Sequence, residues 1–151
     1  MRMVGAHDPA CSPRRCSTFV RAEAVIYVKD LERMCSFYER CVGLAVGDTA
    51  EDYAVLESDL WRLSLVLIPA SVAATIQLSV PARRRETAAI KLGFQVARIE
   101  DLRSPAAVLG GQIDPASTQW DFLGFRRCDA IDPEGNVIQL LEPLAGETAA
   151  R

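Results

Sequence analysis

The sequence predicts an α+β fold built from two β-α-β-β-β (βαβββ) modules in one domain. A strand followed by a helix is expected near residue 22 and again near residue 90, and short strands are expected after each helix. The two halves also match at a constant offset of 68 residues. The matching pairs are Val28 and Val96, Leu31 and Ile99, Glu32 and Glu100, and Gly43 and Gly111. A match across a strand, a helix and its glycine stop indicates two copies of one unit.

Alternation over residues 22–28 predicts the first strand, and Asp30 is a suitable N-cap for the next element. Apolar residues at helical spacing, beginning at Leu31, predict a helix over about 31–42 that Gly43 ends. The expected elements that follow are strands at about 44–49, 52–58 and 61–69, a short helix near 70–77 and an exposed connection over 78–88.

The second half repeats this order. Residues 90–96 predict a strand, and residues 99–109 predict a helix that Gly110 and Gly111 end. Pro105 predicts an irregular or late helix start, because proline lacks the backbone N–H that a helix interior uses. The remaining expected elements are strands at about 112–114, 119–130 (bent or interrupted) and 136–142, with a turn over 133–136.

A chain of 151 residues suits one domain with a proper core. The expected organisation is a domain over 22–143, with modules at about 22–69 and 90–143, a linker at 70–89, and terminal tails at 1–21 and 144–151. We expect the N-terminal tail to be mobile or only loosely docked, because it shows no periodicity.

Charge and composition disfavour several functions. The net charge is −3 and the pI is about 5.2, whereas nucleic-acid binding needs a clustered basic face. The densest basic run, Arg83-Arg84-Arg85, is interpreted as a solvated turn in preference to an anion-steering patch. No stretch approaches the ~20 apolar residues that cross a bilayer, and no secretory signal is evident. We therefore expect a cytoplasmic protein without nucleic-acid or membrane partners.

The five cysteines predict free thiols, because the number is odd and no secretory signal accompanies it. Cys35 and Cys41 fall in a predicted helix and Cys128 in a predicted strand, where thiols usually pack as small hydrophobic groups. Cys11 and the other N-terminal cysteine lie in the expected tail. The single histidine, His7, also lies outside the predicted domain, which disfavours zinc binding and histidine-assisted nucleophilic catalysis.

Several stretches carry a family resemblance in combination. They are VKDLER from Val28, Phe37-Tyr38, Gly43-Leu44, Gly93-Phe94 and DPEGNVIQL from Asp132. Together they resemble the vicinal oxygen chelate superfamily, which includes glyoxalases, bleomycin-resistance proteins and ring-cleaving dioxygenases, over about residues 22–143. The resemblance implies the glyoxalase/bleomycin-resistance fold, in which two modules form a curved mixed sheet around a cleft, and often a homodimer. One helix per module leaves the other face of each sheet free to line such a cleft.

The resemblance also implies a divalent metal held by residues from the first and last strand of each module. Glu23, Ser64, Lys91 and Gln139 occupy the matching positions, where histidine and glutamate are usual. A lysine ammonium has no free lone pair and repels a cation. No cofactor is therefore expected, and a metal held weakly by Glu23 and Gln139 is disfavoured.

We hypothesise that Glu23 and Lys91 form an ion pair across the cleft, where relatives hold the metal. The alternative is that both side chains are partly exposed and stay apart. The cost of removing both charges from water offsets much of the attraction between them. Such a pair would therefore be better evidence for a functional role of the two residues than for a contribution to stability.

Strand alternation assigns further side chains to the cleft. Tyr27 shares a face with Glu23, and Gln95 shares one with Lys91. Tyr27 is a candidate acid or hydrogen-bond donor, or a packed residue with its hydroxyl at the rim. The Arg62 guanidinium could bind a carboxylate or phosphate through two parallel hydrogen bonds, and a solvated surface position is an equally good interpretation of this arginine.

Trp120 and Phe122 precede the final hairpin, and core packing is favoured for them over an aromatic wall beside a ligand. Gly93 on the cleft side leaves space for a ligand or marks a bend.

The first predicted function is metal-independent binding of a small organic molecule in the cleft between the modules. The alternative is a lyase, isomerase or dioxygenase with an atypical site, in which Glu23 is a base, Lys91 stabilises an enolate and Tyr27 is a third catalytic candidate. An interaction or scaffold role is the remaining possibility. The candidate ligand-binding residues are Glu23, Tyr27, Arg62, Ser64, Lys91, Gln95, Trp120 and Gln139.

Overall fold

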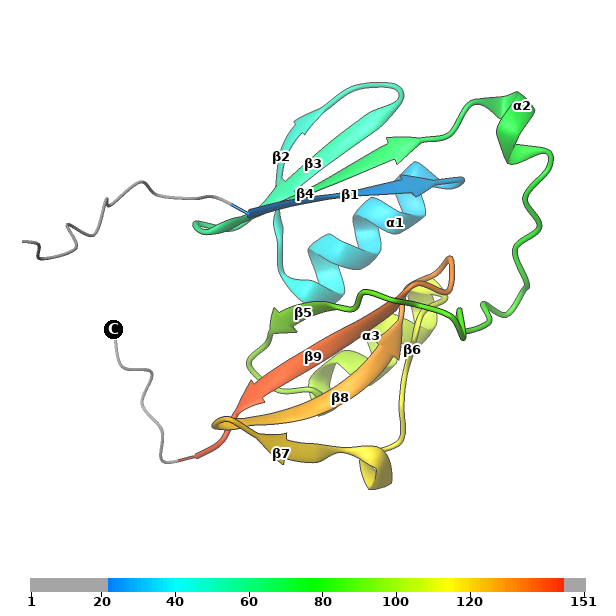
Figure 1. The fold of residues 1–151 in the computed structure, drawn as a ribbon. Helices are drawn as coiled ribbons and strands as arrows, with labels where there is room; N and C mark the ends of the chain where they lie inside the picture. Colours follow the sequence, from blue (N-terminus) through cyan, green and yellow to red (C-terminus); the bar gives the residue numbers. More distant parts are fainter. Residues whose placement is uncertain (1–21, 146–151) are drawn as a thin grey trace, which may run out of the picture.

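Two β-sheets, each packed on its own helix, make up the part of the chain that the computed structural model describes, residues 22–145 (Figure 1). The elements of the first module are β1 (Ala22–Val28), α1 (Leu31–Phe37) continued by a π turn (Tyr38–Val42), β2 (Ala45–Thr49), β3 (Tyr53–Glu57) and β4 (Trp61–Leu67). The strand order is β1-β4-β3-β2, with β1 parallel to β4 and the other pairs antiparallel.

The second module repeats this arrangement after a short helix, α2 (Ala70–Ala73). Its elements are β5 (Leu92–Gln95), a 3-10 turn (Glu100–Leu102), α3 (Arg103–Leu109), β6 (Gln112–Ile113), a second 3-10 turn (Ala116–Thr118), β7 (Trp120–Phe122), β8 (Phe125–Ile131) and β9 (Val137–Pro143). The strand order is β5-β9-β8-β6, with β5 parallel to β9, and β7 pairs with β8. The α+β fold of two βαβββ modules is confirmed.

Local sequence signals set the ends of both helices. The Asp30 carboxylate accepts a hydrogen bond from the Arg33 N–H at 3.0 Å, which caps α1. Gly43 follows the π turn with a φ of 84°, a left-handed conformation that glycine adopts without strain. The 3-10 turn before α3 agrees with the irregular start that Pro105 predicts.

The predicted equivalence of Gly43 and Gly111 is wrong by one residue. Gly110, with a φ of 87°, is the residue that ends α3 as Gly43 ends the first helix. A π turn contains one residue more than an α-helical turn. The first module therefore has one extra residue between its strand and the glycine that ends its helix. The offset between the modules is therefore 68 at Val28 and Val96 but 67 at the helix stops.

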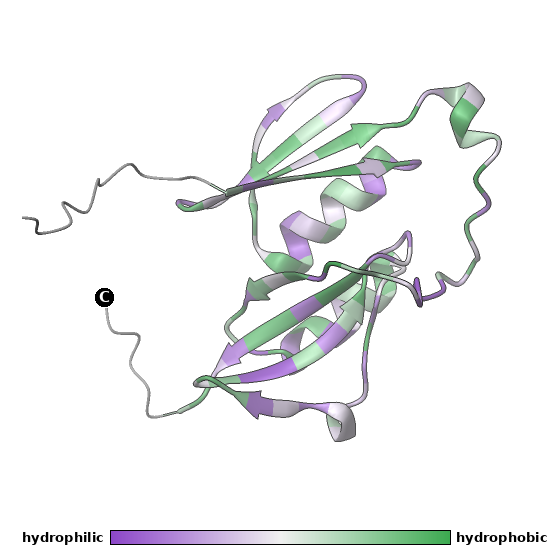
Figure 2. Ribbon diagram, in the orientation of Figure 1, coloured by the Kyte–Doolittle hydropathy of each residue, from purple (hydrophilic) through white to green (hydrophobic). Residues whose placement is uncertain are grey.

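A single core joins the two modules. α1 packs against α3, and the helix-facing sides of both sheets contribute fully buried residues such as Leu63, Leu65 and Leu140. The ring of Phe94 on β5 lies 5.7 Å from that of Tyr38 and 5.3 Å from that of Trp61. Figure 2 shows apolar and polar residues alternating along β8 and β9, as expected of strands with one buried face.

The turn between β8 and β9 ties the modules together. The buried Asp132 carboxylate accepts hydrogen bonds from the Asn136 side chain at 2.7 Å and from the Tyr38 hydroxyl at 2.9 Å. Glu134, also buried, accepts from the backbone N–H groups of Lys29 and Asp30 at 2.7 and 2.9 Å. The DPEGN motif therefore has a structural role: it holds the start and the end of the first module's helix.

Residues 74–91, between α2 and β5, form no helix or strand, so the connection expected over 78–88 is longer at both ends: the short helix ends at Ala73 and β5 begins at Leu92. The expected tail over 1–21, with His7, Cys11 and Cys16, lies outside the described residues, as does most of 144–151. Within residues 22–145 no helix is long and apolar enough to cross a bilayer.

Candidate functional site

Each sheet has an open face, on the side opposite the core. The first open face consists of Glu23, Val25, Tyr27, Arg62, Ser64, Val66, Tyr53, Val55 and Glu57. The second consists of Lys91, Gly93, Gln95, Trp120, Phe122, Arg127, Asp129, Gln139 and Leu141. All eight candidate ligand-binding residues lie on these two faces, Trp120 among them, although core packing was favoured for it.

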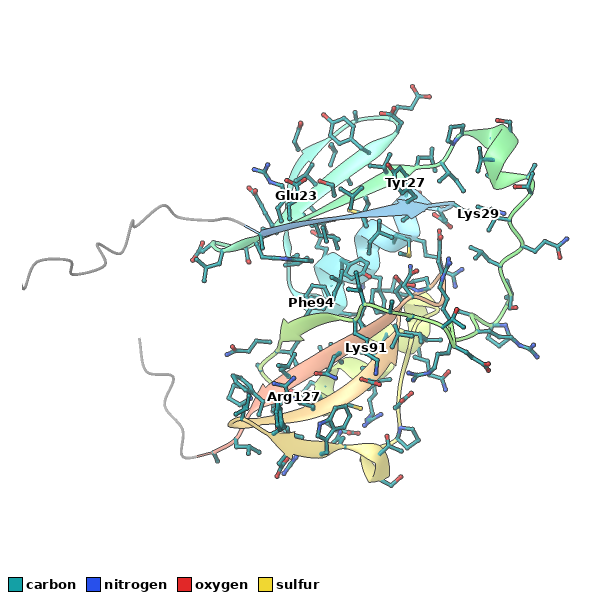
Figure 3. The ribbon with its side chains drawn as sticks, viewed as in Figure 1. Glu23, Tyr27, Lys29, Lys91, Phe94 and Arg127 are labelled. Atoms are coloured by element: carbon teal, nitrogen blue, oxygen red, sulfur yellow. The ribbon has the colours of Figure 1, made fainter. Side chains whose placement is uncertain are left out.

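The exposure of β1 shows this alternation clearly. Val25 and Tyr27 are 51% and 68% exposed, whereas Val28 is fully buried. In Figure 3, Glu23 and Tyr27 lie on the side of the first sheet away from α1, whereas Arg127 belongs to the second sheet and Lys91 lies just before its strand β5. The helix-facing sides of the sheets share the core, so the open faces point away from it and not toward each other within one chain.

On the first open face, strand register aligns three charged residues in a row across the sheet. Glu23 is the register partner of Arg62 on β4, and Arg62 is that of Glu57 on β3. The Glu23 carboxylate accepts a hydrogen bond of 2.8 Å from the Ser64 hydroxyl, and the Arg62 guanidinium lies 3.6 Å from the Glu57 carboxylate. Buried Nε of Arg62 has no hydrogen-bond partner among the described residues.

On the second open face, Asp129 is the centre of a polar network. The Lys91 ammonium lies 2.5 Å from its Oδ2, and the Arg84 guanidinium lies 3.8 Å from the same oxygen. The Gln139 amide donates to its Oδ1 at 3.2 Å. Arg84 also pairs with Asp114. The expectation that the whole arginine run lies in a solvated turn is therefore wrong for Arg84, which reaches over the sheet.

The predicted Glu23–Lys91 ion pair is not formed within the chain. Lys91 pairs with Asp129 of its own module, and Glu23 bonds Ser64 of its own module. The reason is geometric, because the two open faces that carry these residues point in different directions.

Asp129 and Arg127 were not among the predicted site residues, although a signal for both is present in the sequence. Along β8, Arg127 and Asp129 alternate with Cys128 and Ala130, both fully buried. The alternation rule used for β1 and β5 would have placed both polar residues on the open face.

Arg127 lies beside this network, in contact with an aromatic side chain. Its Nη1 donates to Gln139 Oε1 at 2.7 Å, and its guanidinium carbon lies 5.1 Å from the centre of the Phe122 ring. The core packing favoured for Trp120 and Phe122 is wrong: they are 41% and 54% exposed. Their short strand pairs only with β8 at the margin of the sheet, so no second layer covers them.

A cavity of about 530 Å³ lies between the modules. β1 contributes Glu23, Ala24 and Ile26, and the segment before β5 contributes Arg85 and Ile90. The start of β9 contributes apolar residues to the same cavity. Its size falls within the usual range for small-ligand pockets.

The residues at the family's metal positions do not fit a divalent cation. Glu23 is the single carboxylate of the four, and Gln139 already uses its carbonyl oxygen to accept from Arg127. Lys91 brings a positive charge to the remaining position of the second module. Among residues 22–145 no group of three or more histidine, cysteine, aspartate or glutamate side chains could hold a metal ion.

The described cysteines are unsuited to nucleophilic catalysis. Burial raises the pKa of the thiols of Cys35, Cys41 and Cys128, so they stay protonated. Cys128 lies on the core side of β8, away from the open face. These thiols pack as small hydrophobic groups, as the sequence predicts.

Comparison with known proteins supports one family. The family model described as the glyoxalase/bleomycin resistance protein/dioxygenase superfamily matches residues 21–140. The comparison with curated proteins gave no match.

Solved structures with a similar fold share little sequence with the chain. A glyoxalase/bleomycin resistance protein/dioxygenase family enzyme from Burkholderia phytofirmans is 17% identical, with a TM-score of 0.59 over 81% of this chain and 97% of that one. A glyoxalase/bleomycin resistance protein from Albidiferax ferrireducens is 20% identical, with a TM-score of 0.56 over 83% and 98%. The bleomycin-binding protein of Streptomyces verticillus, solved with copper(II)-bleomycin, is 16% identical, with a TM-score of 0.51 over 83% and 98%.

Proposed function

Because the chain belongs to the glyoxalase/bleomycin resistance protein/dioxygenase superfamily, we propose that it binds a small organic molecule on its open faces without a divalent metal. The observation that carries this proposal is the Asp129 network at the second module's metal positions. There Lys91 is held against Asp129, and Gln139 is shared between Asp129 and Arg127. These bonds occupy the groups that would otherwise coordinate a cation.

We further propose that a second copy of the chain completes the binding cleft. The open faces point apart within one chain (Figure 1), yet they expose Val25, Tyr27, Trp120 and Phe122. The first face presents the carboxylate of Glu23, and the second presents the cations Lys91, Arg84 and Arg127. A symmetric dimer that sets the first face of one copy against the second face of the other would bring these opposite charges to the two walls of one cleft and cover the apolar residues.

Binding is favoured over the catalytic alternative by the partners of the candidate residues. A Glu23 base and a Lys91 enolate stabiliser would have to act on one substrate. Even where a dimer brings the two open faces together, Glu23 is bonded to Ser64 and the Lys91 charge is balanced by Asp129, each within its own module. The bleomycin-binding protein with a similar fold offers a precedent for ligand binding by this architecture.

Restoring family-type ligands tests the metal-free part of the proposal. The double variant Lys91→His, Gln139→Glu removes the ammonium and adds an imidazole and a carboxylate, and it should bind Zn²⁺ at least about tenfold more tightly than the wild type in calorimetric titration. The control Arg98→His, Gln77→Glu adds the same groups at exposed positions outside both sheets and should leave affinity unchanged. Wild-type protein that binds Zn²⁺ stoichiometrically and as tightly as the double variant would contradict the proposal.

A further inference from the structure

Arg127 differs from its neighbours in lacking a carboxylate partner. Arg126, the adjacent residue on β8, lies 3.2 Å from the Asp121 carboxylate on the opposite side of the sheet. The described contacts of Arg127 are instead the Gln139 amide oxygen, the Phe122 carbonyl oxygen at 3.4 Å and the Phe122 ring. All three partners are uncharged, so within residues 22–145 the half-buried guanidinium has no counter-charge in an ion pair.

The guanidinium is also held in place. Gln139 accepts from its Nη1 at 2.7 Å and donates to Asp129, whose negative charge is already shared with Lys91 and Arg84. The ring of Phe122 supports it from one side, 5.1 Å away. A pre-oriented guanidinium loses little conformational freedom when it binds an anion, and its planar fork matches a carboxylate.

The surroundings of Arg127 are apolar and partly aromatic. In the strand register, Leu141 of β9 lies on one side of Arg127 and Trp120 of β7 on the other. Trp120 is 41% exposed, so its ring is open to a ligand. The network nearby holds three cations, Arg84, Lys91 and Arg127, against two carboxylates, Asp114 and Asp129, which favours an anion over a cation.

We propose that the ligand is an aromatic carboxylate, with its carboxylate on the Arg127 guanidinium and its ring against Trp120 and Leu141. This inference rests on the proposed function and names the ligand class for the second open face. The carboxylate supplies the counter-charge that Arg127 lacks, and the ring covers exposed apolar surface.

The test compares 2-naphthoate with its neutral isostere 2-naphthamide by isothermal titration calorimetry on the full-length protein. The wild type should bind naphthoate about tenfold to a hundredfold more tightly than naphthamide, because a charge-assisted hydrogen bond replaces a neutral one. Arg127→Gln should abolish this preference. The matched control Arg126→Gln, which removes the neighbouring guanidinium from the opposite side of the sheet, should keep it. Thermal melting of each variant establishes that it is folded.

The outcomes separate this inference from the proposed function. Equal affinity of the wild type for the two probes, or a preference that survives Arg127→Gln, overturns the role of Arg127 while ligand binding stands. Binding of neither probe overturns the aromatic carboxylate as ligand class. The proposed function then depends on native mass spectrometry of protein purified from its own host, in which a co-purified small molecule of any charge supports it and an empty protein does not.

Discussion

At the scale of single residues, Asp132 shows how one buried carboxylate connects two modules. Its pKa is raised by burial, and the hydrogen bonds from Asn136, Tyr38 and the backbone oppose that rise. The Tyr38 hydroxyl that donates to it is itself buried, and burial together with Asp132 raises the phenol's pKa well above its ordinary value. Tyr38 therefore acts as a neutral hydrogen-bond donor from the first module to the second.

Removing this donor should destabilise the fold. Tyr38→Phe deletes one hydroxyl and leaves a buried carboxylate with one donor fewer, so the free energy of unfolding should fall by about 1–3 kcal/mol. The control is Tyr53→Phe, which removes a hydroxyl bonded to Asp48 at 2.7 Å in an exposed position and should cost about 1 kcal/mol or less. Urea denaturation followed by circular dichroism measures both changes, and equal losses in the two variants would contradict the role given to Tyr38.

Sequence could predict where single side chains point, but not which groups they would meet. Alternation predicted that Glu23 and Lys91 lie on the sides of their sheets opposite the helices, and both do. It could not show that Lys91 meets Asp129, because that contact depends on the register of β8 and β9, which sets Asp129 opposite Gln139. It also could not show that no second layer covers Trp120.

At the scale of elements, α1 depends on a residue from the other module. The helix has seven residues before its π turn, too few to be stable by itself. Asp30 caps it locally, and the Glu134 carboxylate accepts from the N–H groups of Lys29 and Asp30 just before it. At the other side of the interface, the Arg33 guanidinium donates to the Leu109 carbonyl at the end of α3, at 2.8 Å.

Neutralising Glu134 should weaken this junction. Glu134→Gln keeps the size of the side chain but removes the negative charge of the carboxylate that accepts two backbone N–H hydrogen bonds near the helix start. The free energy of unfolding should therefore fall by about 1–2 kcal/mol. The matched control is Glu32→Gln, at an exposed position in the first turn of α1, which should lower the free energy of unfolding by less than about 1 kcal/mol. Chemical denaturation measures both losses. If Glu134→Gln unfolds at the same denaturant concentration as the wild type, Glu134 does not hold the start of α1.

Most elements followed from their patterns, and the departures have local causes. The π turn after Phe37 was not predicted, because apolar spacing alone does not distinguish it from another α-helical turn. The interruption between β7 and β8 falls at Leu123 and Gly124, both with positive φ, within the strand that was expected to be bent or broken.

At the scale of the whole molecule, the arrangement of the modules decides where a ligand can bind. Tyr38, Trp61 and Phe94 bring the helix-facing sides of both sheets into one core. The family resemblance predicted the two modules and their cleft. It could not decide whether the open faces meet within a chain or between chains, because both arrangements bury the same alternating residues.

The measurement that tests the central claim most directly is native mass spectrometry of the wild type and of Tyr27→Asp. We predict a wild-type dimer that carries one small molecule per cleft. Tyr27→Asp removes an exposed aromatic ring from the proposed interface and places there a carboxylate that has to lose its water, so it should raise the dimer dissociation constant at least about tenfold and lose the ligand. The control Val108→Asp, at an 80% exposed site on α3, should remain a liganded dimer. A wild-type monomer that retains its ligand would contradict the account, because the cleft would then lie within one chain.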